Sequence, residues 1–167
     1  MWYFHTQERR PVRELVRLLK WAGADSLGPG GAEVWLSGLP RAWAPYRITQ
    51  AEWLTVAEAA RAADLPFSAS LLAVPAERPL ERDALAALQD VTPHHLELKP
   101  LVSAGTALAA LGDANVLRTA ALVNQLRQHL PEVPVYVDWD SDAGDTDTIF
   151  GSAGAERVLV TAWEVTP

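Results

Sequence analysis

Hydrophobic and polar residues alternate along the chain in two patterns, one typical of helices and one typical of strands. Apolar residues at helical spacing, such as Val12, Val16 and Leu19, predict helices. The predicted helices cover residues 11–23, 49–64, 79–91 and 114–130, with a shorter helical piece at 103–111. Short apolar runs bounded by turn residues predict strands at 32–37, 67–74, 94–99, 133–138 and 157–165, and the aromatic residues 2–5 suggest one more short strand.

Strands that alternate with helices indicate βαβ units, and therefore an α/β fold with a mainly parallel sheet and three layers. An open doubly wound sheet is the first expectation. A partial β/α barrel is the alternative, because it has the same order of elements and differs only in closure. Residues 139–156 show no helical periodicity, so an antiparallel edge position of the last strand would fit the pattern. The chain has 167 residues, enough for a single domain spanning residues 1–167.

Composition removes several classes of function. The formal net charge is −7, so a nucleic-acid partner is unlikely, and the arginines near residues 9–17 fit a solvated helix face. The chain has no cysteine, which excludes thiolate zinc sites, iron–sulfur clusters and cysteine nucleophiles. No apolar run reaches the length of a membrane span, and a cytoplasmic protein without a membrane partner is expected. The glycine-rich stretch 26–31 lacks the Lys-Ser/Thr ending of a phosphate-binding loop, so we expect no nucleotide or redox cofactor.

An acidic loop follows the apolar strand at 133–138. Asp138, Asp140 and Asp142 alternate there, and carboxylate oxygens are ligands for hard cations such as Mg²⁺, Mn²⁺ or Ca²⁺. Ala143 and Ile149 stand where an EF-hand requires glycine and glutamate, which excludes that motif. The alternative to a metal site is a solvated polar loop, since aspartate and glycine are common in turns.

The strand at 94–99 carries the second candidate group. His95, Glu97 and Lys99 share one face of this strand, because side chains alternate between the two faces. A polar face is costly in a strand buried on both sides unless its groups are paired or line a site. These three residues are the candidate acid–base or phosphate-polarising groups. An edge strand with one solvent-exposed face would explain the same pattern without any activity.

Two hypotheses of function follow. The first is a divalent-cation-binding, enzyme-like domain that acts on a phosphate-containing or other small polar substrate. The second is a non-catalytic protein-interaction or regulatory domain that uses exposed aromatic loops at Trp43 and Trp139. The pattern decides neither whether the protein is an enzyme nor its oligomeric state. The enzyme hypothesis requires that the carboxyl ends of the strands at 94–99 and 133–138 lie side by side over a pocket.

Overall fold

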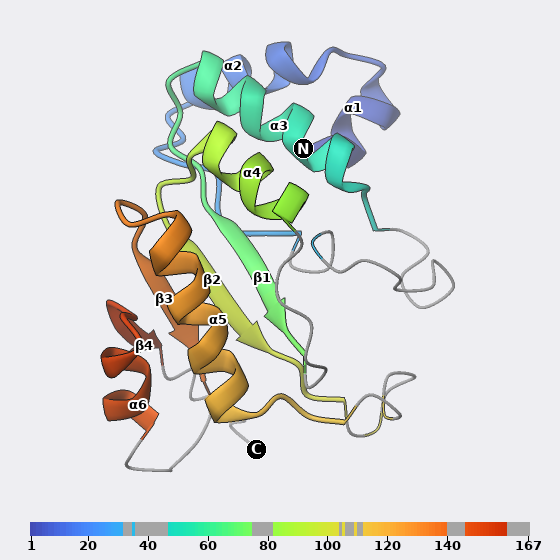
Figure 1. Cartoon of the computed structure of the whole chain (residues 1–167). Helices are drawn as coiled ribbons and strands as arrows, with labels where there is room; N and C mark the ends of the chain where they lie inside the picture. Colours follow the sequence, from blue (N-terminus) through green and yellow to red (C-terminus); the bar gives the residue numbers. More distant parts are fainter. Residues whose placement is uncertain are drawn as a thin grey trace, which may run out of the picture.

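A parallel sheet forms the centre of the protein (Figure 1). The computed structural model describes residues 1–31, 35, 47–74, 82–103, 105, 109, 112–139 and 146–159. The strands of the sheet are β1 (Ala69–Ala73), β2 (Leu96–Pro100), β3 (Val135–Asp138) and β4 (Arg157–Leu159). They are ordered β1-β2-β3-β4, and each neighbouring pair is parallel. An isolated parallel bridge between Leu27 and Phe67 extends the pairing beyond the start of β1.

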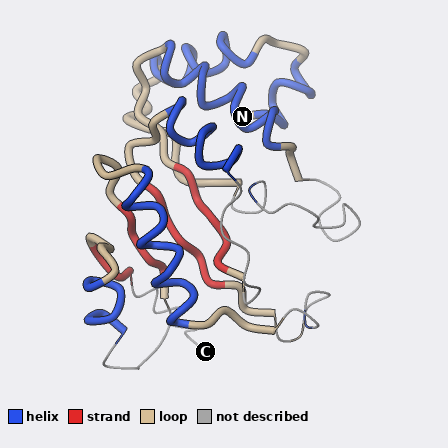
Figure 2. Tube along the Cα trace, in the orientation of Figure 1, coloured by secondary structure: helices blue, strands red, loops and turns tan. Residues whose placement is uncertain are grey.

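Helices surround this sheet on one side and at one end. They are α1 (Trp2–Glu8), α2 (Val12–Trp21), α3 (Gln50–Ala62), α4 (Arg82–Val91), α5 (Val116–His129) and α6 (Thr146–Ser152). Helices α4 and α5 lie across the sheet, whereas α1, α2 and α3 group at the end where β1 begins (Figures 1 and 2). Helix α6 lies beside α5 and β4.

The core lies between the sheet and these helices because each strand presents apolar side chains to one face. Leu71, Leu96, Leu98, Val135 and Val137 are buried, and they alternate with more polar neighbours. Complementary apolar side chains come from α4 and α5, among them Leu85, Leu88, Val123 and Leu126. The opposite face of the sheet is therefore free to carry polar groups.

Helix α3 shows how directly local sequence fixes its start. The Thr49 hydroxyl accepts a hydrogen bond from the Glu52 amide at 3.2 Å, and the Glu52 carboxylate accepts one from the Thr49 amide at 2.7 Å. This reciprocal capping box satisfies two amides that would otherwise lack partners. The helix predicted for residues 49–64 is confirmed.

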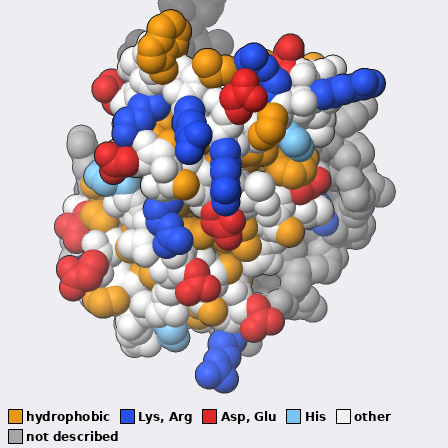
Figure 3. Space-filling model, turned by 90° about the horizontal axis from the view of Figure 1, so that it is seen from above, with side chains coloured by type: hydrophobic (Ala, Val, Ile, Leu, Met, Phe, Trp, Pro, Cys, Tyr) orange, Lys and Arg blue, Asp and Glu red, His pale blue; other side chains and the backbone are white. Residues whose placement is uncertain are grey.

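Charges of both signs cover the helical end of the molecule. Arg10 and Glu14 form an exposed ion pair at 3.3 Å, and Arg13 and Arg17 face solvent. Figure 3 shows acidic side chains interspersed among the basic ones when this end is seen from above. The arrangement fits the solvated helix face expected from the sequence. No helix in the part of the chain that the structure describes is long and apolar enough to cross a membrane.

The predicted α/β class with a parallel sheet is confirmed. The strands follow one another in consecutive order, as in a β/α barrel, whereas a doubly wound sheet reverses its order at a switch point. The structure thus corresponds to the partial barrel that the sequence left as the alternative.

Two local expectations were wrong. Residues 2–5 lie in α1 instead of a strand, with the Trp2 ring 4.7 Å from the His5 ring one helical turn away. The last strand, β4, is parallel and not antiparallel, because α6 supplies the crossover that a parallel connection needs. Helix α6 spans only seven residues, and a segment that short carries little periodicity. Most of residues 32–37 and 103–111, predicted as a strand and a helical piece, lies outside the described residues.

Candidate active site on the polar face of the sheet

Neighbouring strands place polar side chains side by side on the face opposite α4 and α5. The register pairs Ser70 of β1 with Glu97 of β2, and Glu97 with Tyr136 of β3. Side chains at paired positions of parallel strands point to the same face, so the same face also carries His95, Lys99 and Asp138. We call His95, Glu97, Lys99 and Asp138 the polar row.

The members of the polar row contact one another in sequence. The Ser68 hydroxyl lies 2.9 Å from Nδ1 of His95, and Nε2 of His95 lies 3.4 Å from Oε1 of Glu97. The other Glu97 oxygen lies 3.5 Å from Nζ of Lys99, which donates to Oδ2 of Asp138 at 3.3 Å. A continuous line of hydrogen-bonding groups therefore crosses from β1 to β3.

Partial burial strengthens the electrostatic interactions between the charged side chains of the polar row. The side chains of Glu97 and Asp138 are only 15% and 22% exposed, while that of Lys99 is 40% exposed. Charges withdrawn from water interact more strongly than charges at the surface. The Lys99 ammonium thus pairs with two partly buried carboxylates and is itself partly open to solvent.

The structure places four of the six predicted site residues together and leaves two undetermined. His95, Glu97, Lys99 and Asp138 meet because β2 and β3 are adjacent, which is the first half of the condition that the enzyme hypothesis required; a pocket over these strand ends stays a prediction. Asp140 and Asp142 lie outside the described residues.

Sequence reasoning missed two neighbours of the polar row. Ser68 contacts His95, and the Tyr136 ring lies 5.2 Å from the His95 ring in an edge-on arrangement. The signal was the alternation of Ser68 and Ser70 with apolar residues in the first strand, which marks the same polar face as Glu97.

The described residues do not by themselves form a metal centre. Among them, no group of three or more histidine, aspartate or glutamate side chains is arranged to hold a cation. Lys99 instead lies between the two carboxylates of Glu97 and Asp138. A cation at this end of the sheet would need further oxygen ligands and would compete with the ammonium.

Trp139 gives limited support to the protein-interaction hypothesis. Its side chain is partly buried against the core, and its ring lies 5.3 Å from that of the buried Phe150. Its aromatic surface is thus largely used within the fold. Trp43, the other aromatic residue of that hypothesis, lies outside the described residues.

Comparison with known proteins finds partial matches. No protein-family model matches the chain. It is 32% identical over 103 residues to aminodeoxyfutalosine synthase of Thermus thermophilus, a match that covers 59% of this chain and 28% of that protein. It is also 33% identical over 72 residues to 5-amino-6-(D-ribitylamino)uracil–L-tyrosine 4-hydroxyphenyl transferase 1 of Methanosarcina mazei. This match covers 43% of this chain and 19% of that protein. Each match thus spans less than a third of the relative's length.

Solved structures match most of this chain. Phosphoenolpyruvate phosphomutase from Streptomyces platensis subsp. rosaceus gives a TM-score of 0.58 at 18% identity, covering 90% of this chain and 56% of that one. 2,3-Dimethylmalate lyase gives a TM-score of 0.58 at 14% identity, covering 87% of this chain and 52% of that one. HMG-CoA lyase from Brucella melitensis gives a TM-score of 0.55 at 15% identity, covering 89% of this chain and 53% of that one. At such low identity the likeness concerns the fold alone, and this chain corresponds to about half of the length of each of these three chains.

Proposed function

We propose that the polar row is the active site of an enzyme-like domain that binds a small anionic substrate carrying a carboxylate or a phosphate. One observation carries the proposal: Lys99 lies at the carboxyl ends of two adjacent parallel strands, between Glu97 and Asp138, and remains partly open to solvent. Active sites of β/α barrels are built at this end of the strands. The names of the solved neighbours, which include a phosphoenolpyruvate phosphomutase and a 2,3-dimethylmalate lyase, fit a site for small acids.

The side chains of the polar row would have different roles in this site, according to their chemistry. Lys99 would bind the anionic group, since an ammonium pairs with carboxylate or phosphate oxygens. Glu97 would take up or donate a proton beside the anion, because it contacts Lys99, and His95 would exchange a proton with Glu97 from the amino end of β2, where Ser68 orients it. The reaction supported best is therefore proton transfer at an atom next to the bound anion.

A divalent cation is the second part of the proposal. Asp138, Asp140 and Asp142 would hold Mg²⁺, Mn²⁺ or Ca²⁺ through their carboxylate oxygens. When bound, such an ion polarises a substrate oxygen. Thermal unfolding with each metal and with EDTA tests this part. A stabilisation by metal that Asp138→Asn removes would support it, and the same curves with and without metal would contradict it.

The substrate class is tested by calorimetric titration with pyruvate, malate and inorganic phosphate. The chain has only two lysines, and Lys20, with 43% of its side chain exposed, offers a matched control for Lys99. We expect Lys99→Met to weaken anion binding at least tenfold and Lys20→Met to leave it nearly unchanged. Equal affinities of the two variants, or no binding to the native chain, would refute the proposal and favour a non-catalytic partner-binding domain.

A further inference from the structure

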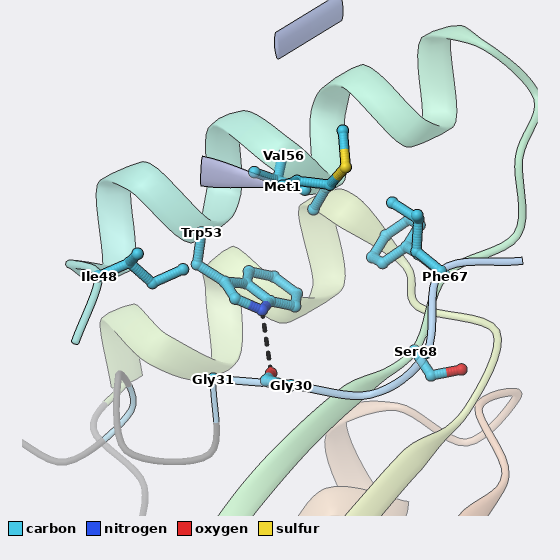
Figure 4. Close-up of a pocket in the computed structure, with 11 residues that line it drawn as sticks. Met1, Gly30, Gly31, Ile48, Trp53, Val56, Phe67 and Ser68 are labelled. Atoms are coloured by element: carbon cyan, nitrogen blue, oxygen red, sulfur yellow. Dashed lines mark hydrogen bonds between the residues drawn. The ribbon is translucent and has the colours of Figure 1, made fainter. Parts of the chain in front are cut away.

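An apolar pocket lies at the amino end of β1, away from Lys99, and shares Ser68 with the surroundings of His95. It opens between helix α3, the segment 27–31 and the first residues of the strand region around Phe67 (Figure 4). Its volume is about 310 Å³. That volume is at the lower end of the range found for small-molecule sites.

Two aromatic side chains define the shape of this pocket. The rings of Trp53 and Phe67 are buried and lie 6.1 Å apart with their planes inclined at 65°. The Trp53 indole is held in place, because its Nε1 donates to the Gly30 carbonyl at 3.1 Å and Trp35 packs edge-on against it at 4.9 Å. Figure 4 shows the Trp53 ring between Ile48 and Phe67. The walls are thus fixed in position before any ligand binds.

Glycine backbone forms the side of the pocket opposite α3. Gly28 and Gly30 line the pocket, and a Cβ atom added at either glycine would meet no heavy atom within 4 Å. A flat group can approach closely where no side chain intervenes. A planar ligand fits this combination of aromatic walls and open backbone better than a branched aliphatic one.

The chemistry of the lining selects for a neutral group. None of the side chains that line the pocket is charged, and most are apolar. The lining side chains include Leu27, Ile48, Val56, Ala57 and Ser68. Met1, the first residue of the chain, also lines the pocket, but no charged side chain of the described lining could compensate the desolvation of a buried charged group.

We propose that this pocket is a binding site for a neutral planar aromatic or heteroaromatic ring. The site is distinct from the polar row, although the two meet at Ser68, which lines the pocket and contacts His95 with its hydroxyl. Aromatic rings pack edge-on or offset against other rings, and Trp53 and Phe67, which line the pocket, already pack edge-on against each other. The pocket lies at the amino end of β1, whereas Lys99 and Asp138 lie at the carboxyl ends of β2 and β3, so the two sites are at opposite ends of the sheet.

The test uses indole as the probe, with saturation-transfer NMR and protein-detected titration on the full chain. Val56→Phe narrows the pocket from α3, because Val56 lines it and is half-buried. Leu54→Phe is the matched control: it makes a similar enlargement at a half-buried position of the same helix that does not line the pocket. Cyclohexanol serves as a non-planar probe of similar size.

We expect indole to bind to the native chain and to Leu54→Phe, with at least a fivefold loss of affinity in Val56→Phe and weaker binding of cyclohexanol. A circular dichroism melt shows whether each variant is folded, and Gly30→Leu provides a second obstruction if Val56→Phe is not. The proposal is overturned if indole does not bind to the native chain, if it binds equally to an obstructed folded variant, or if cyclohexanol binds as well. Lys99→Met separates the two sites, because it should abolish anion binding and leave indole binding intact.

Discussion

Replacement of Lys99 by methionine removes the positive charge that the carboxylates of Glu97 and Asp138 share. The two oxygens that contact Nζ at 3.5 and 3.3 Å cannot be far from each other. The repulsion between the two carboxylates is present with and without Lys99, so the substitution costs the two attractions of the ammonium, each about 1 kcal/mol in water at such distances. Solvent screening of Lys99, which is 40% exposed, limits both attractions, and we expect a loss of stability of about 1–2 kcal/mol.

The assay is a double-mutant cycle measured by urea unfolding. Lys99→Met, Asp138→Asn and the double variant are compared with the native chain, and the coupling energy is obtained from the four free energies of unfolding. Asp138→Asn should restore part of the stability that Lys99→Met removes, because it eliminates one of the two repelling charges. For a domain of this size, a loss of about 1–2 kcal/mol corresponds to a decrease of roughly 3–6 °C in Tm.

The second lysine supplies the control cycle. Lys20 lies 3.4 Å from the Asp64 carboxylate, and the Asp64 side chain is fully exposed. The cycle of Lys20→Met with Asp64→Asn should show almost no coupling. If the Lys99 and Asp138 substitutions were additive within about 0.5 kcal/mol, the charge-sharing geometry of the polar row would be refuted.

Three further predictions concern the scaffold, and urea unfolding measures each of them. Gly154→Ala should destabilise the fold by about 1–2 kcal/mol, because Gly154 has a φ of +100° and an added Cβ would lie 3.0 Å from Arg127 Cγ; an unchanged free energy of unfolding would contradict this packing. Thr49→Ala should cost about 1 kcal/mol by removing the capping box with Glu52, whereas Thr49→Ser should retain most of it. Leu98→Ala should cost about 2–5 kcal/mol, since Leu98 is fully buried in the core, and a loss below about 1 kcal/mol would contradict its central position.

The elements that the sequence predicted well are those whose signals are local. The capping box at Thr49 and Glu52 fixes the start of α3 without help from the rest of the chain. The apolar runs around Leu71, Leu98 and Val137 identify three strands, because strands buried on at least one face need such residues. The order of the strands and the closure of the sheet depend on contacts between residues distant in sequence. The hydrophobic pattern alone therefore could not distinguish a β/α barrel from a doubly wound sheet.

The ends of the chain show where local signals fail. The aromatic residues 2–5 have side chains suited to a strand, yet a strand needs a neighbour to accept its hydrogen bonds, and this segment folds as α1 instead. The seven residues of α6 contain one deeply buried apolar side chain, Phe150, which is too few to establish a helical period. The parallel direction of β4 could not be predicted without that helix.

The sequence predicted those parts of the candidate site that follow from the alternation of side chains between the two faces of a strand. His95, Glu97 and Lys99 share a face by the period of a strand, and Asp138 joins them because β3 pairs next to β2. The contact between Lys99 and the two carboxylates required the strand order, which the sequence left undetermined. The role of Ser68 required the neighbouring strand as well, since its partner His95 lies 27 residues away.

The central claim is that Lys99 and its carboxylate neighbours form an anion-binding active site at the carboxyl ends of β2 and β3. The most direct measurement is a titration of the isotope-labelled chain with pyruvate or inorganic phosphate, followed by backbone amide NMR. We predict saturable shifts that concentrate at Lys99 and Asp138 and disappear in Lys99→Met. Shifts that do not saturate, or that concentrate on the arginines of α2 and persist in Lys99→Met, would contradict the claim.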